Sequence, residues 1–256
     1  MDTPTWVEEH QKSWDAKPAL RKFYQREVYD RVIEHLADGP SLELGAGAGL
    51  FSRYFQSRLP AAELVRTDVT EQPGLDAVVD AHDLPFDDGA FANVIYVHVL
   101  HHLAVPVQAL RESARVLRPG GRVLLVEPWT GALGTLFYKY VHQEDYAPLA
   151  DPWTGGFGPG KAPMDGNVAL PRQILYDRLH EVPEKTGGLH VLGTEHFAGP
   201  SYLMTGGFQR SVTLPKVLYD VSSFFERMVP KFLRPTLMLQ MFTILEKRPT
   251  SDVRTQ

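Results

Sequence analysis

Three glycines at alternate positions, Gly45, Gly47 and Gly49, follow the short apolar segment 41–44 and precede an amphipathic segment. Glycine accepts positive φ and has no Cβ, so a ligand can approach the backbone of such a turn closely. A helix that starts here directs unpaired N–H groups and the positive end of its dipole at the same point. Leu50 stands where a dinucleotide fingerprint has its third glycine. The segment therefore predicts a turn that binds a polar or anionic part of a cofactor, and a turn built only for packing is the alternative.

Histidine is the residue type here that can exchange a proton near neutral pH. His98 and His101 stand at or just past the end of an apolar segment, and His142 follows an aromatic-rich stretch. Open α/β sheets bind ligands at the carboxyl ends of their strands, so these three are our candidates for a catalytic base. A hydrogen-bonded structural role is the alternative for each. His142, Glu144 and Asp145 could also suggest a metal site, but no tight motif such as H-E-x-x-H is present, and we expect no metal.

Alternating apolar and amphipathic segments predict a parallel, doubly wound α/β sheet that would position these residues. Strands are expected at 41–44, 62–67, 77–80, 92–99 and 122–126, with closing strands at 189–197 and 241–247. Helices are expected at 18–38, 50–58 and 107–117. The interval 69–75 is too short for a full crossover helix. Either this crossover is abbreviated or one strand assignment is wrong.

The regular alternation stops after the fifth strand. Residues 130–170 are rich in glycine, proline and aromatics, and a loop of this length in a compact domain is usually functional. Between the closing strands, apolar residues from Val217 to Val229 recur at helical spacing. We interpret this stripe first as core. The entrance for an apolar substrate or a patch that contacts a membrane surface is the alternative.

Composition limits the class of protein. The 256 residues suit one domain with a sizeable core, and there is no cysteine, which excludes disulfides and thiolate chemistry. Neither a signal peptide nor a membrane-spanning apolar run is recognisable, so we expect a soluble, cytoplasmic protein. The net charge of −5 argues against a nucleic-acid partner. From Thr205 onward, however, 8 Lys and Arg stand against 4 Asp and Glu, so this region is basic on an acidic body.

Five segments stand in one order: Leu42–Gly49, Asp68 at a strand end, Asp80–Phe86, His98–Leu103, and Arg115–Arg122 before a strand. Together they resemble the class I S-adenosylmethionine-dependent methyltransferases, in the small-molecule branch that includes the ubiquinone/menaquinone-type enzymes. The resemblance covers roughly residues 40–127. It implies S-adenosylmethionine as cofactor and a Rossmann-like, seven-stranded, mostly parallel sheet whose last strand is antiparallel. We divide the single domain into an N-terminal helical extension (1–38), a cofactor-binding core (40–127), an acceptor-side insertion and lid (128–235) and a closing strand (236–248).

The resemblance also suggests roles for the glycine-rich loop. Gly45, Ala46, Gly47 and Gly49 match the loop that passes under the methionine portion of the cofactor. Glu43 matches the acidic residue that braces this loop. Capping of a backbone turn is the alternative for Glu43.

Four further residues match positions around the nucleoside and the methyl group. Asp68 matches the acid that accepts hydrogen bonds from the ribose hydroxyls, and Asp80 and Ala81 match the segment beside the adenine. His98 stands where the tip of the fourth strand lies beside the methyl group. Two departures matter. The interval from Asp68 to Asp80 is short for the family, and relatives often carry Asp or Asn where this chain has His98.

The sequence therefore predicts an enzyme that transfers a methyl group to oxygen, nitrogen or carbon of a small acceptor. Aromatic residues between positions 129 and 157 suggest an apolar, amphipathic or lipid-like acceptor, although aromatics that merely cover the sheet would look the same. A non-catalytic, cofactor-binding member of the fold is the first alternative. An NAD-dependent oxidoreductase and a nucleic-acid methyltransferase fit less well, because Leu50 breaks the dinucleotide fingerprint and the net charge is negative.

Overall fold

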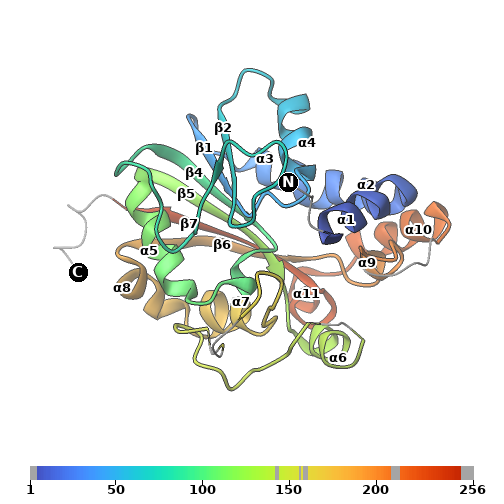
Figure 1. Ribbon diagram of the computed structural model, residues 1–256. Helices are drawn as coiled ribbons and strands as arrows, with labels where there is room; N and C mark the ends of the chain where they lie inside the picture. Colours follow the sequence, from blue (N-terminus) through green and yellow to red (C-terminus); the bar gives the residue numbers. More distant parts are fainter. Residues whose placement is uncertain (1–4, 142–143, 156, 158–160, 209–213, 249–256) are drawn as a thin grey trace.

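A seven-stranded sheet forms the centre of the protein in our computed structural model, which describes residues 5–141, 144–155, 157, 161–208 and 214–248 (Figure 1). The strands are β1 (Ser41–Leu44), β2 (Leu64–Asp68), β3 (Ala77–Val78), β4 (Phe91–Val97), β5 (Leu117–Pro128), β6 (Leu189–Phe197) and β7 (Gln240–Lys247). Their order is β3-β2-β1-β4-β5-β7-β6, and β7 runs antiparallel to both of its neighbours. The predicted fold class is confirmed.

Helices cover both faces of the sheet, which explains why its central strands are apolar almost throughout (Figure 1). One face carries α2 (Pro18–Phe23), the π-helical turn η1 (Tyr24–Tyr29), α3 (Asp30–Glu34) and α4 (Leu50–Arg58). The other face carries α5 (Pro106–Val116), α7 (Leu170–Arg172) and α8 (Val182–Thr186). In β4, every side chain from Phe91 to Tyr96 is buried. Burial on both faces keeps the strand ends, where ligands bind, in fixed positions.

The crossover between β2 and β3 is abbreviated, as the short interval 69–75 allowed. No helix joins the two strands, and β3 has only two residues at the edge of the sheet. Asp76 holds this connection by accepting hydrogen bonds from the guanidinium of Arg66 at 2.7 and 2.8 Å. The predicted strand 77–80 was too long, because the chain leaves the sheet after Val78.

The boundary between α5 and β5 differs from the prediction. The helix ends at Val116, and β5 begins at Leu117 rather than at residue 122. Leu117 pairs with Phe91 before a register shift, so the Pro119-Gly120-Gly121 turn signal lies within an irregular start of the strand. The strand begins at Leu117 because this residue pairs with β4, although the local sequence favours a turn.

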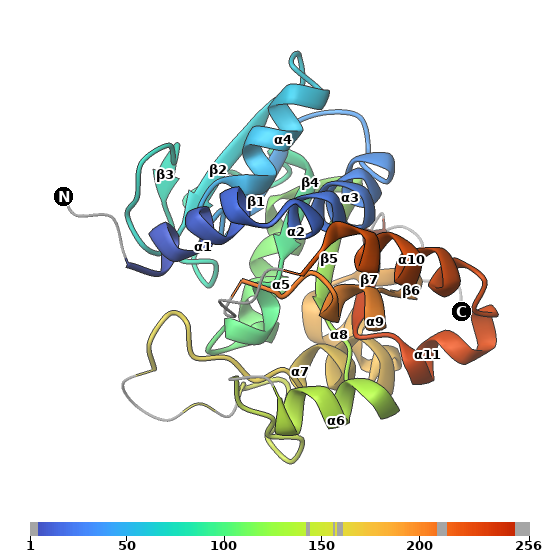
Figure 2. The ribbon, with the colours of Figure 1, turned by 90° about the vertical axis from the view of Figure 1, so that its right-hand side faces the viewer.

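The remaining helices gather beyond the carboxyl ends of the strands (Figure 2). They are α1 (Thr5–Ala16), α6 (Ala132–Tyr140), α9 (Pro200–Leu203), α10 (Lys216–Arg227) and α11 (Arg234–Leu237), with the short turns η2 (Leu100–His102) and η5 (Lys231–Leu233). The turns η3 (Gln173–Asp177) and η4 (Leu179–Glu181) connect α7 to α8 on the face that α5 covers. Among the described residues, no helix combines the length and apolarity that crossing a bilayer requires.

Our first interpretation of the stripe on α10 as core was wrong. Phe224 and Phe225 are more than 60% exposed, and Val217, Leu218, Val221 and Met228 also face outward. The opposite side of α10, with Tyr219 and Ser223, is the buried one. Helical spacing of apolar residues predicts one apolar face but cannot show what covers it.

Candidate functional site

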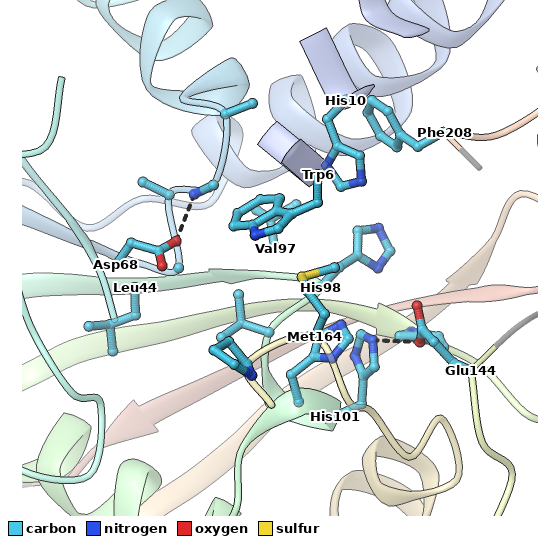
Figure 3. A pocket seen from close by; sticks show the side chains of 18 of the residues that line it. Trp6, His10, Leu44, Asp68, Val97, His98, His101, Glu144, Met164 and Phe208 are labelled. Atoms are coloured by element: carbon cyan, nitrogen blue, oxygen red, sulfur yellow. Dashed lines mark hydrogen bonds and ion pairs between the residues drawn. The ribbon is translucent and has the colours of Figure 1, made fainter. Parts of the chain in front are cut away.

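A cavity of about 530 Å³ opens at the carboxyl ends of β1, β2 and β4, where an open α/β sheet is expected to bind its ligand (Figure 3). Most residues that the sequence singled out line it: Glu43, Gly45, Ala46, Gly47, Asp68, Asp80, Ala81, His98 and His101. Gly49 lies behind the loop, where it begins α4. His142 lies outside the described residues. Residues almost 60 positions apart in the chain thus meet in one cavity.

The glycine-rich loop has the conformation that its sequence predicted. Gly45, Gly47 and Gly49 have φ of 71°, 53° and 65°, in the left-handed region that favours glycine. A Cβ on Gly45 would also lie 2.6 Å from Cγ2 of Val99, so no other residue fits there without movement. The N–H of Ala46 donates to the carbonyl of Thr67 at 2.8 Å and ties the loop to the end of β2. The loop is therefore held open toward the cavity.

Asp68 is a fixed hydrogen-bond acceptor at the end of β2. Its two carboxylate oxygens accept the backbone N–H groups of Gly47 at 3.0 Å and Thr70 at 2.9 Å. Only 7% of the residue is exposed, and this burial raises the pKa of its carboxyl group above the ordinary value. The remaining lone pairs of the oriented carboxylate can accept two further donors, as a pair of ribose hydroxyls would provide.

Asp80 lies at the rim of the same cavity. Burial alone would raise the pKa of its carboxyl group, but hydrogen bonds from the backbone N–H and the ring of His82 lower it. Asp80 is therefore ionised at neutral pH and available to accept a hydrogen bond from an exocyclic amine.

Glu43 is buried on β1, just before the glycine-rich loop. Its carboxyl group accepts a hydrogen bond from the hydroxyl of Ser52 on α4, and its carbonyl accepts one from Thr67 at 2.8 Å. Complete burial raises the pKa of Glu43 to about 7. The carboxyl group therefore keeps its proton in the folded protein at pH values where the unfolded chain has lost it.

This shift predicts a pH-dependent stability that Glu43→Gln removes. Folding binds a proton at Glu43 between its unfolded pKa of 4.5 and its folded pKa of about 7, so this contribution is lost as pH rises through that window. The free energy of unfolding, measured with urea, should fall between about pH 5 and about pH 7.5 by about 2 kcal/mol more in wild type than in Glu43→Gln. The difference between the two proteins cancels the titration of other groups. An equal difference at both pH values would contradict the buried, protonated carboxyl.

Histidines and glutamates cluster at the wall of the cavity, where His101 and Glu127 are buried and His102 and Glu144 are partly exposed. His98, at the tip of β4, has φ of 59°, a strained conformation for a residue with a side chain and one that is often found at functional sites. His101 is 2% exposed, and its two ring nitrogens lie 2.5 Å from Glu127 and 3.1 Å from Glu144. Burial favours the neutral ring, but the two carboxylates outweigh it and raise the pKa of His101 to about 10. Desolvation and the nearby His101 lower the pKa of His102 to about 4.

The N-terminal helix also reaches the site, which the sequence did not predict. Trp6 and His10 line the cavity and are four residues apart on α1, so both project from one side of the helix (Figure 3). The Trp6 ring would lie 3.7 Å from a Cβ on Gly47 and therefore covers the loop. His10 packs on Phe208, with ring centroids 4.6 Å apart. The i, i+4 spacing of the two rings was the only signal in the sequence.

Comparison with known proteins identifies the class. The family profile of a methyltransferase domain matches residues 42–125. Demethylmenaquinone methyltransferase of Thermus thermophilus is 33% identical over 152 residues, which cover 53% of this chain and 68% of that protein. Malonyl-[acyl-carrier protein] O-methyltransferase of Alcanivorax borkumensis is 28% identical over 214 residues, 75% of this chain and 70% of that protein. A SAM-dependent methyltransferase structure from Archaeoglobus fulgidus matches with a TM-score of 0.55 at 17% identity, over 89% of this chain and 94% of that chain.

The chain therefore belongs to the class I S-adenosylmethionine-dependent methyltransferases. Within that class it is an enzyme of the small-molecule branch, with S-adenosylmethionine as its cofactor. The residues of the cavity fit this group. The positive-φ glycines leave the loop backbone free of side chains, Asp68 presents an oriented carboxylate, and about 530 Å³ is in the range of small-molecule sites.

Proposed function

We propose that the protein methylates an amphipathic, lipid-like acceptor that it takes up at a membrane surface. One observation carries this proposal: an apolar face that α10 and its neighbours present to solvent beside the cavity. The names of the two relatives both describe methyl transfer, but to different acceptors. They therefore support methyl transfer, and the acceptor is inferred from this chain alone.

The cofactor-binding part of the proposal assigns one role to each residue. Asp68 would accept hydrogen bonds from the ribose hydroxyls, and Asp80, next to Ala81, would accept one from the adenine amine. Gly45 and Gly47 would leave their backbone open to the methionine portion. The burial and hydrogen bonds of Asp68 support its role, because they fix the carboxylate before the ligand arrives.

Methyl transfer needs alignment and, for most acceptors, removal of one proton. S-adenosylmethionine supplies an electrophilic methyl group, whose bond to sulfur breaks as the acceptor atom bonds to its carbon. We assign proton removal first to His98, which lines the cavity at the tip of β4. His101 would position the acceptor from beneath the cavity, where Glu127 and Glu144 hold its ring. The role of His142 stays a prediction.

The apolar face consists of nine exposed residues on α10, η5 and α11: Val217, Leu218, Val221, Phe224, Phe225, Met228, Phe232, Leu233 and Leu237. Phe232 is 78% exposed, and Phe224 and Phe225 are 63% and 62% exposed. A helix that presents its apolar side to water and its polar side to the protein is typical of contact with another apolar phase.

The charges around the apolar face favour an anionic lipid surface over a second protein chain. Lys231 is exposed at its edge, and Arg227, also exposed there, pairs with Glu27 at 3.1 Å. The acidic residues of α10 are engaged elsewhere: Asp220 pairs with Lys22 and Lys216, and Glu226 accepts hydrogen bonds from Ser201. Basic side chains that flank an apolar surface attract the anionic headgroups of a bilayer.

The apolar face also leads to the cavity. α11 packs on α6, whose outer residues Leu136 and Tyr140 are exposed. Phe137 and Tyr138 of the same helix line the cavity. Val141, which follows α6, both lines the cavity and is 49% exposed to solvent. α6 and α11 lie next to each other (Figure 2). An acyl or prenyl chain could pass from a bilayer to the site along their exposed apolar residues.

The test is co-sedimentation with lipid vesicles. We expect the protein to sediment with vesicles of phosphatidylcholine and phosphatidylglycerol in equal parts, and less with pure phosphatidylcholine. Replacing Phe224, Phe225 and Phe232 together by serine should reduce binding at least about 100-fold, because each buried phenylalanine contributes about 1.5 kcal/mol or more. Leu149→Ser is the matched control, since Leu149 is 98% exposed and outside the apolar face.

Two outcomes would contradict the membrane proposal. Equal vesicle binding by wild type and the triple serine variant would show that the apolar face is not the contact. A wild-type dimer that the triple variant abolishes, together with no vesicle binding, would show that a second copy of the chain covers the face. Sedimentation velocity on the same samples distinguishes these outcomes.

A further inference from the structure

Three potential metal ligands converge beneath the cavity. One donor atom each from His101, His102 and Glu144 lies within 4.8 Å of the other two. Within this set, Nε2 of His101 and the carboxylate of Glu144 are 3.1 Å apart (Figure 3). In a tetrahedral site with bonds of about 2.1 Å, neighbouring ligand atoms are about 3.4 Å apart, so this spacing is close to that of a bound ion. A direct ion pair explains this one distance equally well.

Glu127 supports the interpretation as a ligand site. Its second oxygen lies 2.5 Å from Nδ1 of His101, while its first accepts the backbone N–H groups of Val99 at 3.0 Å and Leu100 at 2.7 Å. A carboxylate in this position holds the proton on Nδ1, so an ion that displaces the second proton from Nε2 would meet a lone pair directed toward Glu144. Metal-ligating histidines commonly have such a carboxylate behind them.

The surroundings of His102 are not explained by the ion pair between His101 and Glu144. Its Nδ1 atom is buried and has no hydrogen-bond partner among the described residues, although the ring also contacts the backbone of Asp165. Gly166 makes room for this ring, because a Cβ there would lie 2.9 Å from Nδ1 of His102 and 3.1 Å from the ring of His101. A buried nitrogen left without a donor is unfavourable, whereas a metal ion would use its lone pair.

The loop that carries Glu144 is fixed to the two histidines before any ion binds. The N–H of Asn167 donates to the carbonyl of His101 at 2.8 Å, and the N–H of Val168 donates to that of Asp145 at 3.1 Å. The side chain of Asn167 exchanges two hydrogen bonds with the backbone of Ala147. These contacts tie both His101 and the segment 145–147 to residues 167–168 and hold the ligand set together.

We propose that His101, His102 and Glu144 bind one divalent transition-metal ion, such as Zn²⁺ or Mn²⁺, at the acceptor end of the cavity. Two imidazoles and one carboxylate are a donor set that suits these ions. All three residues line the cavity, so a fourth position faces the space where the acceptor would bind. The role of the ion rests on the proposed function.

The ion would make the acceptor more reactive in one defined way. It would bind a hydroxyl or enol oxygen of the acceptor and lower the pKa of that group. The proton leaves to a base, the oxygen forms its bond to the methyl carbon, and the carbon–sulfur bond breaks with its electron pair on sulfur. The products are the methyl ether, S-adenosylhomocysteine and one proton, so no oxidant or reductant is needed.

The test is titration of the chelator-treated protein with Co²⁺ in the absence of cofactor and acceptor. We expect one equivalent to bind and to give the intense visible absorption of a four- or five-coordinate cobalt ion. His102→Ala and Glu144→Gln should weaken binding at least about 100-fold, and Glu127→Gln roughly 10- to 100-fold. His196→Gln is the control, because His196 is a second buried histidine that packs on Trp129, away from the cluster.

No Co²⁺ binding, or equal binding by wild type and His102→Ala, would overturn the metal site. The measurement contains no acceptor, so it is independent of the proposed function. A protein that binds S-adenosylmethionine and vesicles but no Co²⁺ would retain the proposed function without the ion. Calorimetric unfolding of each variant identifies any variant that fails to fold. If His102→Ala does not fold, Glu144→Gln still tests the site, because it replaces a partly buried side chain by one of the same shape.

Discussion

Replacement of Asp68 by alanine is expected to weaken the binding of S-adenosylmethionine and S-adenosylhomocysteine about 100-fold. The carboxylate would lose two hydrogen bonds from the ribose, each worth about 1.5 kcal/mol or more because the acceptor is charged. A total near 3 kcal/mol corresponds to about two orders of magnitude in Kd. The variant would also release the N–H of Gly47, which Asp68 anchors at 3.0 Å, so the glycine-rich loop would be held less firmly. Isothermal titration calorimetry measures both ligands directly.

Glu71→Ala is the control for this experiment. Glu71 is an exposed carboxylate three residues further along the same loop, and it does not line the cavity. Its removal changes the net charge as Asp68→Ala does, but should leave Kd within about twofold. If Asp68→Ala bound the cofactor as tightly as Glu71→Ala, the assignment of the ribose site would be wrong.

Replacement of Glu127 by leucine is expected to lower the free energy of unfolding by about 3 to 5 kcal/mol. Glu127 has no exposed surface and accepts three hydrogen bonds, from Val99, Leu100 and His101. Contact with His101 lowers the pKa of Glu127 although burial alone would raise it, so the pair is buried as two charges. Without the carboxylate, two backbone N–H groups remain buried and unpaired, and the charge on His101 keeps only Glu144 as its partner. Urea unfolding of chelator-treated protein measures the loss.

A surface ion pair provides the comparison for Glu127. Glu8 pairs with Lys12 at 3.9 Å, and both side chains are more than half exposed. Glu8→Ala should therefore cost less than about 1 kcal/mol, because water and salt screen such pairs. A Glu127→Leu variant as stable as Glu8→Ala would contradict the buried charge pair beneath the cavity.

The sequence predicted the sheet well because its signals are local and repeated. The segment 41–44 is a strand and 50–58 is a helix as expected, since an apolar run, a glycine turn and an amphipathic run follow one another. The conformation of Gly45 was predictable for the same reason, because a left-handed turn leaves few choices of residue. The end of α5 was less predictable, because pairing between Leu117 and Phe91 extends β5 over a turn signal.

The rest depended on contacts between distant segments. The cluster of His101, Glu127 and Glu144 joins the turn η2, the end of β5 and the loop after α6, and no spacing in the sequence marks it. Trp6 reaches Gly47 only because α1 packs across the cavity. The apolar stripe of α10 was visible in the sequence, but the same spacing fits a buried helix and an exposed one. Sequence patterns gave the residue types at each face, and only the tertiary structure gave their surroundings.

The central claim is that the methyl acceptor is an amphipathic molecule from a membrane. The most direct measurement incubates the protein with S-adenosylmethionine labelled in its methyl group and with separated membranes and soluble extract from the organism that carries it. We expect the label in the organic-solvent extract of the membranes, with Asp68→Ala inactive and the triple serine variant at Phe224, Phe225 and Phe232 strongly reduced. Label that appears only in water-soluble products of the soluble extract, at equal rates for wild type and the triple variant, would contradict the account.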